Sequence, residues 1–179
     1  MLKPYMLFFM VLTYTMSVCF IHTIAHSRVT TSLSVPRFAS IKTTKARMRV
    51  GPGTKYRTSY IYCCQHLPVQ IIAEFDSWRK IKDIHNNQGW MHQSLLSEAK
   101  YVTINDNKIL YKKSLEKNLS KSQLFIFKSP DENSRPVLKI DLGTIAKNIK
   151  CRDNWCKVKI NKYIGWVRKI NIWGTSGIS

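Results

Sequence analysis

Cysteines and histidines are the side chains of this 179-residue sequence that could support nucleophilic chemistry. A thiol hydrolase needs a cysteine with a histidine nearby to act as its base. Cys63 and Cys64 are followed by His66, His85 and His92, so the residue types are present. No nucleophile motif surrounds the cysteines, the ten acidic residues form no paired-carboxylate motif, and no glycine-rich phosphate loop occurs. We therefore expect a protein that is not an enzyme, with no catalytic residues and no cofactor.

Cys151 and Cys156 form a C-x4-C spacing that could be considered for zinc. Structural zinc sites need a second matched pair of ligands, which the sequence does not offer. We expect no metal site.

The net charge of +19, from 29 Lys and Arg against 10 Asp and Glu, is the outlier of the composition. Such a charge attracts anionic partners, including nucleic acid, lipid phosphates and acidic cell-wall polymers. A codon bias that favours Lys, Asn and Ile is an alternative origin, since the lysines are spread along the chain. The charge indicates a class of partner and identifies none.

The N-terminus has the order of a signal peptide. Lys3 precedes an apolar run over residues 5–21, and Ala25 and Ser27 supply an A-x-S cleavage pattern. We expect a signal peptide helix over residues 1–25 and export to the periplasm or cell envelope. The run is long for a signal peptide and short for a spanning helix, so an uncleaved anchor is the alternative. Residues 26–40 are rich in Ser and Thr and are expected to form a tether.

Comparing the sequence with itself shows a duplication. Three markers recur in the same order, at offsets of 77, 76 and 78 residues: Asp76–Lys82 as Asp153–Lys159, Gly89–His92 as Gly165–Arg168, and Val50–Gly53 as Lys128–Asp131. Nearly constant spacing of this kind indicates two copies of one unit.

Each copy is predicted to consist of short strands joined by turns. Residues 45–50 alternate between basic and apolar side chains, and the Gly-Pro-Gly at 51–53 ends that strand. About five strands in some 60 residues indicate a small closed barrel. The expected organisation is all-β, with one barrel at 41–97, a linker with a hairpin over 101–111 at 98–122, and a second, degenerate barrel at 123–174.

The turn at Asp153-Asn154 predicts a disulfide. If these two residues form the turn, Cys151 faces Cys156 in a non-hydrogen-bonded cross-strand pair, where Cα atoms approach closely. An exported chain permits such a bond. The equivalent pair in the first copy is Glu74 and Arg79, of opposite charge. Cys63 and Cys64 cannot easily bridge each other, and we expect one of them to be buried and the other free.

Several motifs of the first copy resemble those of bacterial SH3-like (SH3b) domains. They are Met48–Gly53, Pro68-Val69, Trp78–Ile81 and Gly89–His92, which follow a pattern of L-R-x-G-P, W-x-K-V and G-W-V. The chain from Arg37 to Leu96, with the C-x4-C second copy and a closing Trp173-Gly174, is similar to exported alphaproteobacterial proteins with two such domains. In the second copy Ser129 stands where the family has glycine. The resemblance implies two tandem SH3-like barrels and a binding role, commonly to peptidoglycan or its peptide stems.

Candidate ligand-binding residues follow from strand alternation. If Ile81 and Val158 point into the barrels, Trp78 and Trp155 lie outward or at the rim, flanked by lysines. Aromatic and cationic side chains together suit a peptide or glycan that carries carboxylates. The candidates are Trp78, Lys80, Tyr56, Tyr60, Trp155 and Lys157. Alternatively, the two tryptophans plug a barrel end or pack between the copies. Trp90 and Trp166 are expected in the cores, and His92 is expected to be a plain surface residue.

The expected partner is peptidoglycan, its peptide stems or another anionic envelope component. A protein–protein adaptor in the periplasm that docks a partner by edge-strand addition is a second interpretation. Nucleic-acid binding is a third, because charge and aromatic residues are combined in single-strand binders. The signal sequence argues against it. The positive charge also suggests attraction to a membrane surface.

Overall fold

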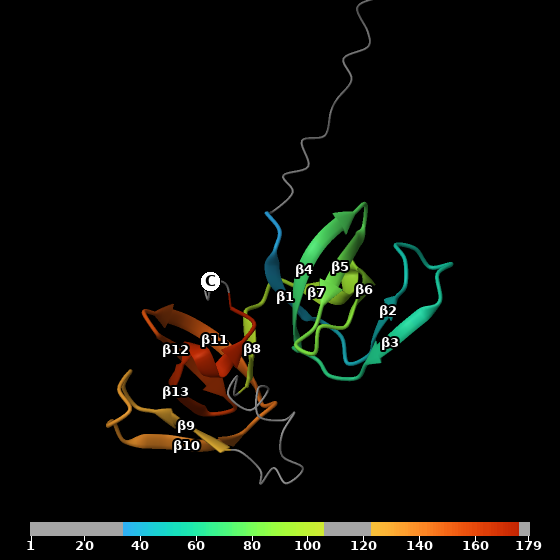
Figure 1. The fold of residues 1–179 in the computed structure, drawn as a ribbon. Helices are drawn as coiled ribbons and strands as arrows, with labels where there is room; N and C mark the ends of the chain where they lie inside the picture. The colour runs from blue at the N-terminus through green and yellow to red at the C-terminus, as the bar shows by residue number, and fades with distance from the viewer. Residues whose placement is uncertain (1–33, 106–122, 176–179) are drawn as a thin grey trace, which may run out of the picture. The chain divides into compact units, whose positions relative to one another are not determined.

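The computed structural model describes residues 34–105 and 123–175, which form two seven-stranded sheets (Figure 1). The first sheet contains β1 (Arg37–Ile41), β2 (Ala46–Arg49), β3 (Thr58–Tyr62), β4 (Pro68–Phe75), β5 (Trp78–Lys82), β6 (Gln88–His92) and β7 (Leu96–Ser97), with the 3-10 helix η1 (Gln93–Leu95) before β7. The second contains β8 (Tyr101–Ile104), β9 (Gln123–Phe127), β10 (Pro136–Asp141), β11 (Ile145–Arg152), β12 (Trp155–Ile160), β13 (Tyr163–Arg168) and β14 (Ile172–Trp173), with η2 (Lys169–Asn171) before β14.

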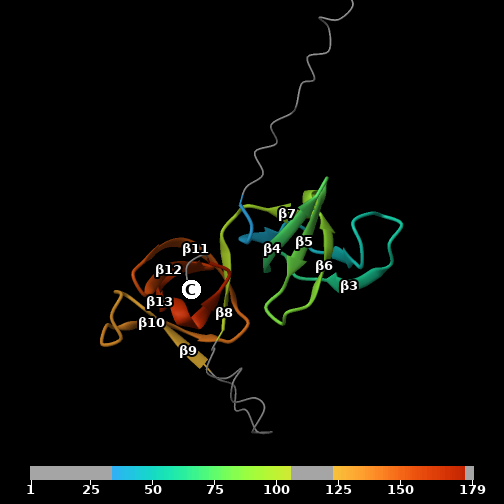
Figure 2. The same cartoon turned by 45° about the horizontal axis from the view of Figure 1, so that its top comes forward.

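The two sheets have the same topology. The first has the order β3-β2-β6-β5-β4-β1-β7, and the second has β10-β9-β13-β12-β11-β8-β14, so each strand corresponds to the one seven places later. The paired strands are antiparallel, and each sheet curls on itself (Figure 2). Each sheet encloses its own set of buried side chains. The prediction of an all-β chain with two tandem SH3-like barrels is confirmed.

The first strand of each barrel lies outside the boundary expected from the sequence. β1 lies in the segment expected as a tether, yet it pairs with both β4 and β7. β8 lies in the expected linker and pairs with β11 and β14. The first arm of the hairpin expected over 101–111 therefore has β11 on one side and β14 on the other. Residues 106–122 lie outside the described residues, as do 1–33 with the expected signal helix.

Many equivalent positions contribute to both cores, although Cys156 of the second core corresponds to Arg79 in the first barrel. Met48, Ile81 and Met91 are buried in the first barrel, and Ile126, Val158 and Val167 replace them in the second. The cores consist of Ala39, Ile41, Ala46, Met48, Tyr62, Val69, Ile71, Ile81 and Met91 in one barrel and Val102, Ile104, Ile126, Ile140, Ala146, Cys156, Val158, Val167 and Ile172 in the other.

Trp90 and Trp166 do not belong to these cores, contrary to the prediction. Both are half-buried, and on β6 the buried residues are Gly89 and Met91. The reason is the crossing of β6 by β2, since a Cβ on Gly89 would lie 2.6 Å from Met48 Cγ and 2.8 Å from the Arg49 carbonyl oxygen. Glycine therefore occupies the core-facing position, and strand alternation turns the following tryptophan outward.

The predicted hairpin register and disulfide are confirmed. Cys151 pairs with Cys156 and Arg152 with Trp155 across the Asp153-Asn154 turn, and the two sulfur atoms are bonded. Asp153 has a φ of 53°, a left-handed conformation that aspartate tolerates better than most residues. Cys156 is buried in the core, whereas Cys151 is exposed.

The first barrel has an ion pair at the equivalent place. Glu74 faces Arg79, and the two side chains are 3.1 Å apart. Glu74 also accepts a hydrogen bond from Arg37 on β1, so one carboxylate connects three strands. Cys63 and Cys64 are both free and both exposed, so the expectation that one is buried is wrong: the two follow the end of β3 in the loop that leads to β4.

None of the described helices is long or apolar enough to cross a bilayer.

Candidate functional site

A pocket of about 320 Å³ opens on the outer surface of the first barrel. It lies where the ends of β2, β5 and β6 meet the β2–β3 loop and η1. Its lining consists of Lys45, Arg47, Arg49, Thr54, Trp78, His92, Ser94 and Leu95. Three of these eight residues are cationic and none is acidic, so the pocket favours an anion.

Strand alternation places the cations and the aromatic ring in this pocket. On β2, Ala46 and Met48 are buried, so Arg47 and Arg49 point to the other side of the sheet. Trp78 at the start of β5 pairs with His92 at the end of β6, and their rings meet edge to face with centroids 5.4 Å apart. The His92 ring nitrogen Nδ1 lies 2.8 Å from Ser94 Oγ, which fixes the imidazole against the indole.

The glycine-rich β2–β3 loop forms one wall. Tyr56 packs over Gly51 and Gly53, and a Cβ on Gly51 would lie 2.5 Å from its ring. Arg49 donates a hydrogen bond of 2.6 Å to the Tyr56 carbonyl oxygen. The glycines therefore let the tyrosine cover the loop, and the loop in turn anchors a pocket arginine and positions Thr54.

Of the six residues proposed from the sequence, Trp78 alone lines the pocket. Tyr56 supports the loop, and Tyr60, 48% exposed, lies on β3 with its ring 4.8 Å from that of Tyr62. Lys80 is half-buried opposite Trp90. Trp155 and Lys157 belong to the second barrel.

Sequence reasoning missed most of the lining. The alternation at residues 45–49 places Lys45, Arg47 and Arg49 on one side of a strand. That pattern could have identified these three cations as candidate binding residues. His92 was expected to be a plain surface histidine, although it contacts Trp78 in the pocket.

The same face of the second barrel has different chemistry. By strand register, Phe125 and Phe127 replace Arg47 and Arg49, and Arg168 replaces His92. Trp155 is equivalent to Trp78.

Those replacements contact the second tryptophan. Phe127 meets the Trp155 ring edge to face at 6.0 Å, and the Arg168 guanidinium carbon lies 5.7 Å from the ring centroid. Arg168 is also paired with Glu132 at 2.8 Å. The Trp155 indole and the Arg168 guanidinium therefore already have interaction partners within the second barrel. The two barrels do not have equivalent sites on this face.

The β2–β3 loop and the equivalent β9–β10 loop nevertheless have the same backbone hydrogen bonds. In the first barrel Val50 donates to Arg57, Gly53 to Gly51 and Tyr56 to Gly53. The second barrel repeats all three backbone hydrogen bonds, from Lys128 to Arg135, Asp131 to Ser129 and Ser134 to Asp131. The loop shape is retained without its glycines, while Ser134 replaces the covering tyrosine.

A buried polar pair distinguishes the first barrel further. Asp83 is 3% exposed and accepts hydrogen bonds from Tyr62 Oη at 3.0 Å and from the amides of His85 and Asn87 at 2.9 Å each. Burial, followed by the charge of Asp83, raises the pKa of Tyr62 above the ordinary value. The equivalent positions of the second barrel hold Ile140 and Ile160, which pack in its core.

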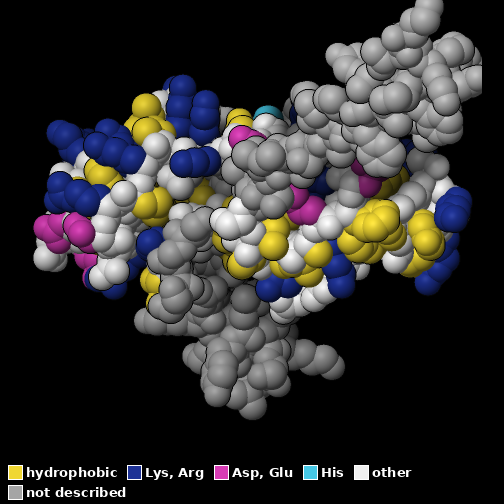
Figure 3. Space-filling model, turned by 90° about the horizontal axis from the view of Figure 1, so that it is seen from above, with side chains coloured by type: hydrophobic (Ala, Val, Ile, Leu, Met, Phe, Trp, Pro, Cys, Tyr) yellow, Lys and Arg dark blue, Asp and Glu magenta, His cyan; other side chains and the backbone are white. Residues whose placement is uncertain are grey.

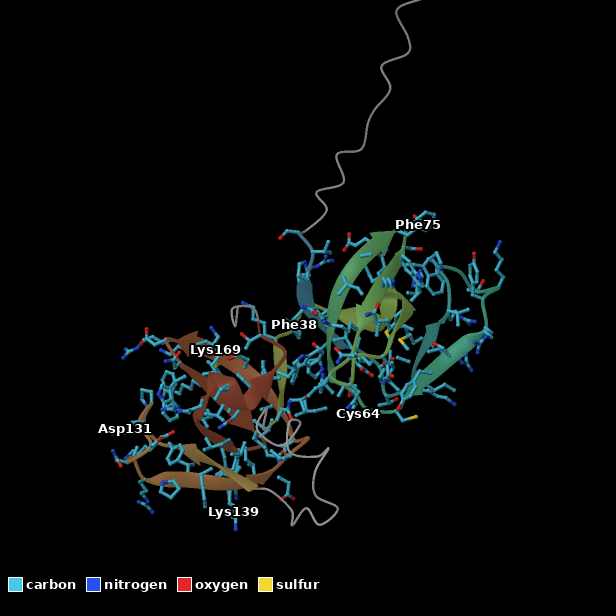
Figure 4. All side chains as sticks on the ribbon, in the orientation of Figure 1. Phe38, Cys64, Phe75, Asp131, Lys139 and Lys169 are labelled. Carbon is cyan, nitrogen blue, oxygen red and sulfur yellow. A yellow bond between two sulfur atoms is a disulfide. The ribbon has the colours of Figure 1, made fainter. Side chains whose placement is uncertain are left out.

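The arrangement offers binding chemistry. The pocket lining contains no cysteine, so His92 has no thiol beside it there. The described residues contain no group of three or more His, Cys, Asp or Glu that could hold a metal ion. Figure 4 shows Cys64 beyond β3 and Phe75 at the tip of the β4–β5 hairpin. Basic side chains outnumber acidic ones on the face drawn in Figure 3.

Two small curled β-barrels of identical strand order, one with an open cationic and aromatic pocket, define a class of binding module. A sequence profile for the bacterial SH3 domain matches residues 42–98 and 120–174, one in each barrel. The chain belongs to the bacterial SH3 domain family, whose domains are often cell-wall-binding modules.

Among solved structures, the chain is similar to NlpC2 from Trichomonas vaginalis, with 11% identity and a TM-score of 0.33 over 79% of this chain and 49% of that one. It is also similar to an NlpC/P60 family protein from Bacillus cereus, with 13% identity and a TM-score of 0.30 over 76% of this chain and 55% of that one. The chain thus spans about half the length of these proteins. No curated protein matches.

Proposed function

We propose that this chain is an exported, non-catalytic binding protein of the bacterial cell envelope. In this proposal the first barrel holds a carboxylate-bearing component, with the peptide stems of peptidoglycan as the leading ligand. The observation that carries the proposal is the pocket itself, in which Trp78 and His92 adjoin Lys45, Arg47 and Arg49 with no acid in the lining.

The chemistry of the pocket fits such a ligand. Arginine forks bind carboxylates with two parallel hydrogen bonds, and an indole face packs against the aliphatic part of a peptide or the apolar face of a sugar. The second barrel supplies the same fold with a covered tryptophan, so ligand binding is assigned to the first barrel.

The test is co-sedimentation with purified peptidoglycan sacculi at moderate salt. Wild type is compared with Trp78→Ala, with Arg47→Gln plus Arg49→Gln, and with Trp155→Ala as the matched control in the other barrel. We expect the first two variants to lose most of their sacculus binding and Trp155→Ala to retain it. Circular dichroism checks that each variant is folded. If wild type does not sediment with sacculi, or if Trp155→Ala is as impaired as Trp78→Ala, the proposal is wrong.

A further inference from the structure

Four lysines of the second barrel form two directly facing pairs on neighbouring strands. On β11 and β12, Lys147 lies opposite Lys159, and Lys150 lies opposite Lys157. Three of the four are exposed and Lys157 is half-buried. Within residues 34–105 and 123–175, none of these lysines is in an ion pair with an acid.

The first barrel avoids this arrangement. The equivalent pairs on β4 and β5 are Gln70 with Lys82 and Ala73 with Lys80, each with a single charge. Like charges that lie directly opposite each other on adjacent strands destabilise a sheet. The facing lysines of the second barrel therefore lower the stability of their own sheet. Clustered cations that destabilise a fold are expected where the charges serve binding.

Exposed apolar side chains lie among these lysines. Ile149, 47% exposed, is the extra residue at the β11 irregularity between Asn148 and Lys150. Ile164, 44% exposed, lies on β13 directly opposite Lys159. In the first barrel Ile72 is half-buried and Gln88 replaces Ile164, so this feature also belongs to the second barrel.

We propose that this lysine–isoleucine surface, made of Lys147, Ile149, Lys150, Lys157, Lys159 and Ile164, binds an anionic lipid bilayer. Lysines near a membrane are attracted to acidic headgroups, while apolar side chains between them enter the interface. A soluble polyanion would engage the lysines and leave the isoleucines in water. The surface lies on the outer face of the β11–β12–β13 ladder and is separate from the Trp78 pocket, so the inference does not rest on the proposed function.

The test uses the full chain and vesicles of phosphatidylcholine with or without a quarter of phosphatidylglycerol. Because the N-terminal residues are common to all variants, the quantity compared is the ratio of affinities for the two vesicles. Lys150→Gln plus Lys159→Gln is expected to lower that ratio by about fivefold per lysine. The Ile149→Ser plus Ile164→Ser variant is expected to bind acidic vesicles at low salt as the wild type does. At high salt its affinity should be roughly fivefold lower, because charge is screened there and the contribution of apolar burial remains. Lys42→Gln plus Lys82→Gln removes the same charge from the first barrel and is expected to leave the ratio unchanged.

Stability provides a readout of opposite sign. Lys159→Gln relieves the repulsion from Lys147, so its melting temperature should rise while its vesicle affinity falls. A purely structural role for these lysines predicts a fall in both. The proposal is overturned if wild type binds both vesicles equally or if the lysine variants bind acidic vesicles as tightly as wild type. It is also overturned if those variants lose binding to a labelled oligonucleotide but not to vesicles.

Discussion

The guanidinium of Arg168 lies over the ring of Trp155, 5.7 Å from its centroid, whereas the equivalent Trp78 lines the pocket of the first barrel. His92 holds the position of Arg168 in the first barrel and meets Trp78 edge to face. One pair of aligned positions therefore serves internal packing in one barrel and lines an open pocket in the other.

This relationship predicts opposite effects of matched substitutions. Arg168→Ala should lower the free energy of unfolding by about 1 kcal/mol, because a cation–π contact and a surface ion pair are lost. His92→Ala should affect stability less and should weaken ligand binding. Urea unfolding and sacculus sedimentation measure the two effects. Equal loss of binding in both variants would contradict the assignment of the site to the first barrel.

The pocket arginines should determine how strongly ligand affinity varies with salt concentration. Arg47→Gln removes one of three cations, so ligand affinity should fall and should also become less sensitive to ionic strength. Titration of a purified muropeptide at low and high salt measures both quantities. Lys139→Gln, an exposed lysine on β10 of the second barrel, is the control with the same change in net charge. A salt dependence that changes equally in both variants would place the binding charge elsewhere.

The disulfide should stabilise the second barrel by a modest amount. Closing so short a loop restricts the unfolded chain by about 2 kcal/mol. Cys151→Ala should cost less than Cys156→Ala, since Cys156 is buried in the core and its replacement also leaves a cavity. Thermal melts with and without reductant measure this cost.

Alkylation of the oxidised protein provides the control. Among the four cysteines from residue 63 onward, Cys63 and Cys64 alone should react, because both are free and exposed. Labelling of Cys151 before reduction would show that the bond is not formed.

The Tyr62–Asp83 hydrogen bond should make the first barrel sensitive to alkali. Because the folded-state pKa of Tyr62 is raised, its stabilising contribution is complete below the ordinary value of 10.0 and is lost as the pH rises above it. Tyr62→Phe should cost about 1.5–3 kcal/mol at neutral pH, since a buried carboxylate loses a donor.

The same variant should flatten the fall in stability above pH 10.0. Urea unfolding across the alkaline range measures the slope. Ile140→Val, at the equivalent position of the second barrel, should leave that slope unchanged. A wild-type slope identical to that of Tyr62→Phe would exclude the tyrosine as its source.

Gly165 should tolerate no side chain. A Cβ there would lie 2.4 Å from Ile126 Cγ2 and 2.7 Å from the Phe127 carbonyl oxygen, and the backbone cannot move away cheaply. Gly165→Ala should cost about 1–3 kcal/mol through overpacking. Gly53→Ala, whose nearest contact would be the Tyr56 ring at 3.3 Å, should cost less. Equal melting temperatures for the two variants would refute the close approach.

Local features of the sequence predicted local features of the structure. The Asp153-Asn154 turn determines which residues face each other, so the register and the Cys151–Cys156 bond followed from counting outward from the turn. The repeat offsets likewise predicted two barrels of the same strand order.

Features that depend on distant segments were not predictable in this way. The pocket requires β6 to lie between β2 and β5, an order that no local pattern encodes. β1 was missed, and the partners of β8 were not foreseen, because each strand is short and pairs with residues 28 or more positions away along the chain. Ser40, which is buried in β1, also belongs to the Ser- and Thr-rich composition that predicted a tether over residues 26–40.

The position of β1 beside β7, and of β8 beside β14, brings the entry and exit of each unit to one place. A gene segment that encodes such a unit can be copied into a chain without interrupting an existing sheet. The connection between the first two strands of a unit can also differ in length. It spans residues 42–45 between β1 and β2 but residues 105–122 between β8 and β9. The fold thus allows the two copies to change independently, as the different neighbours of Trp78 and Trp155 illustrate.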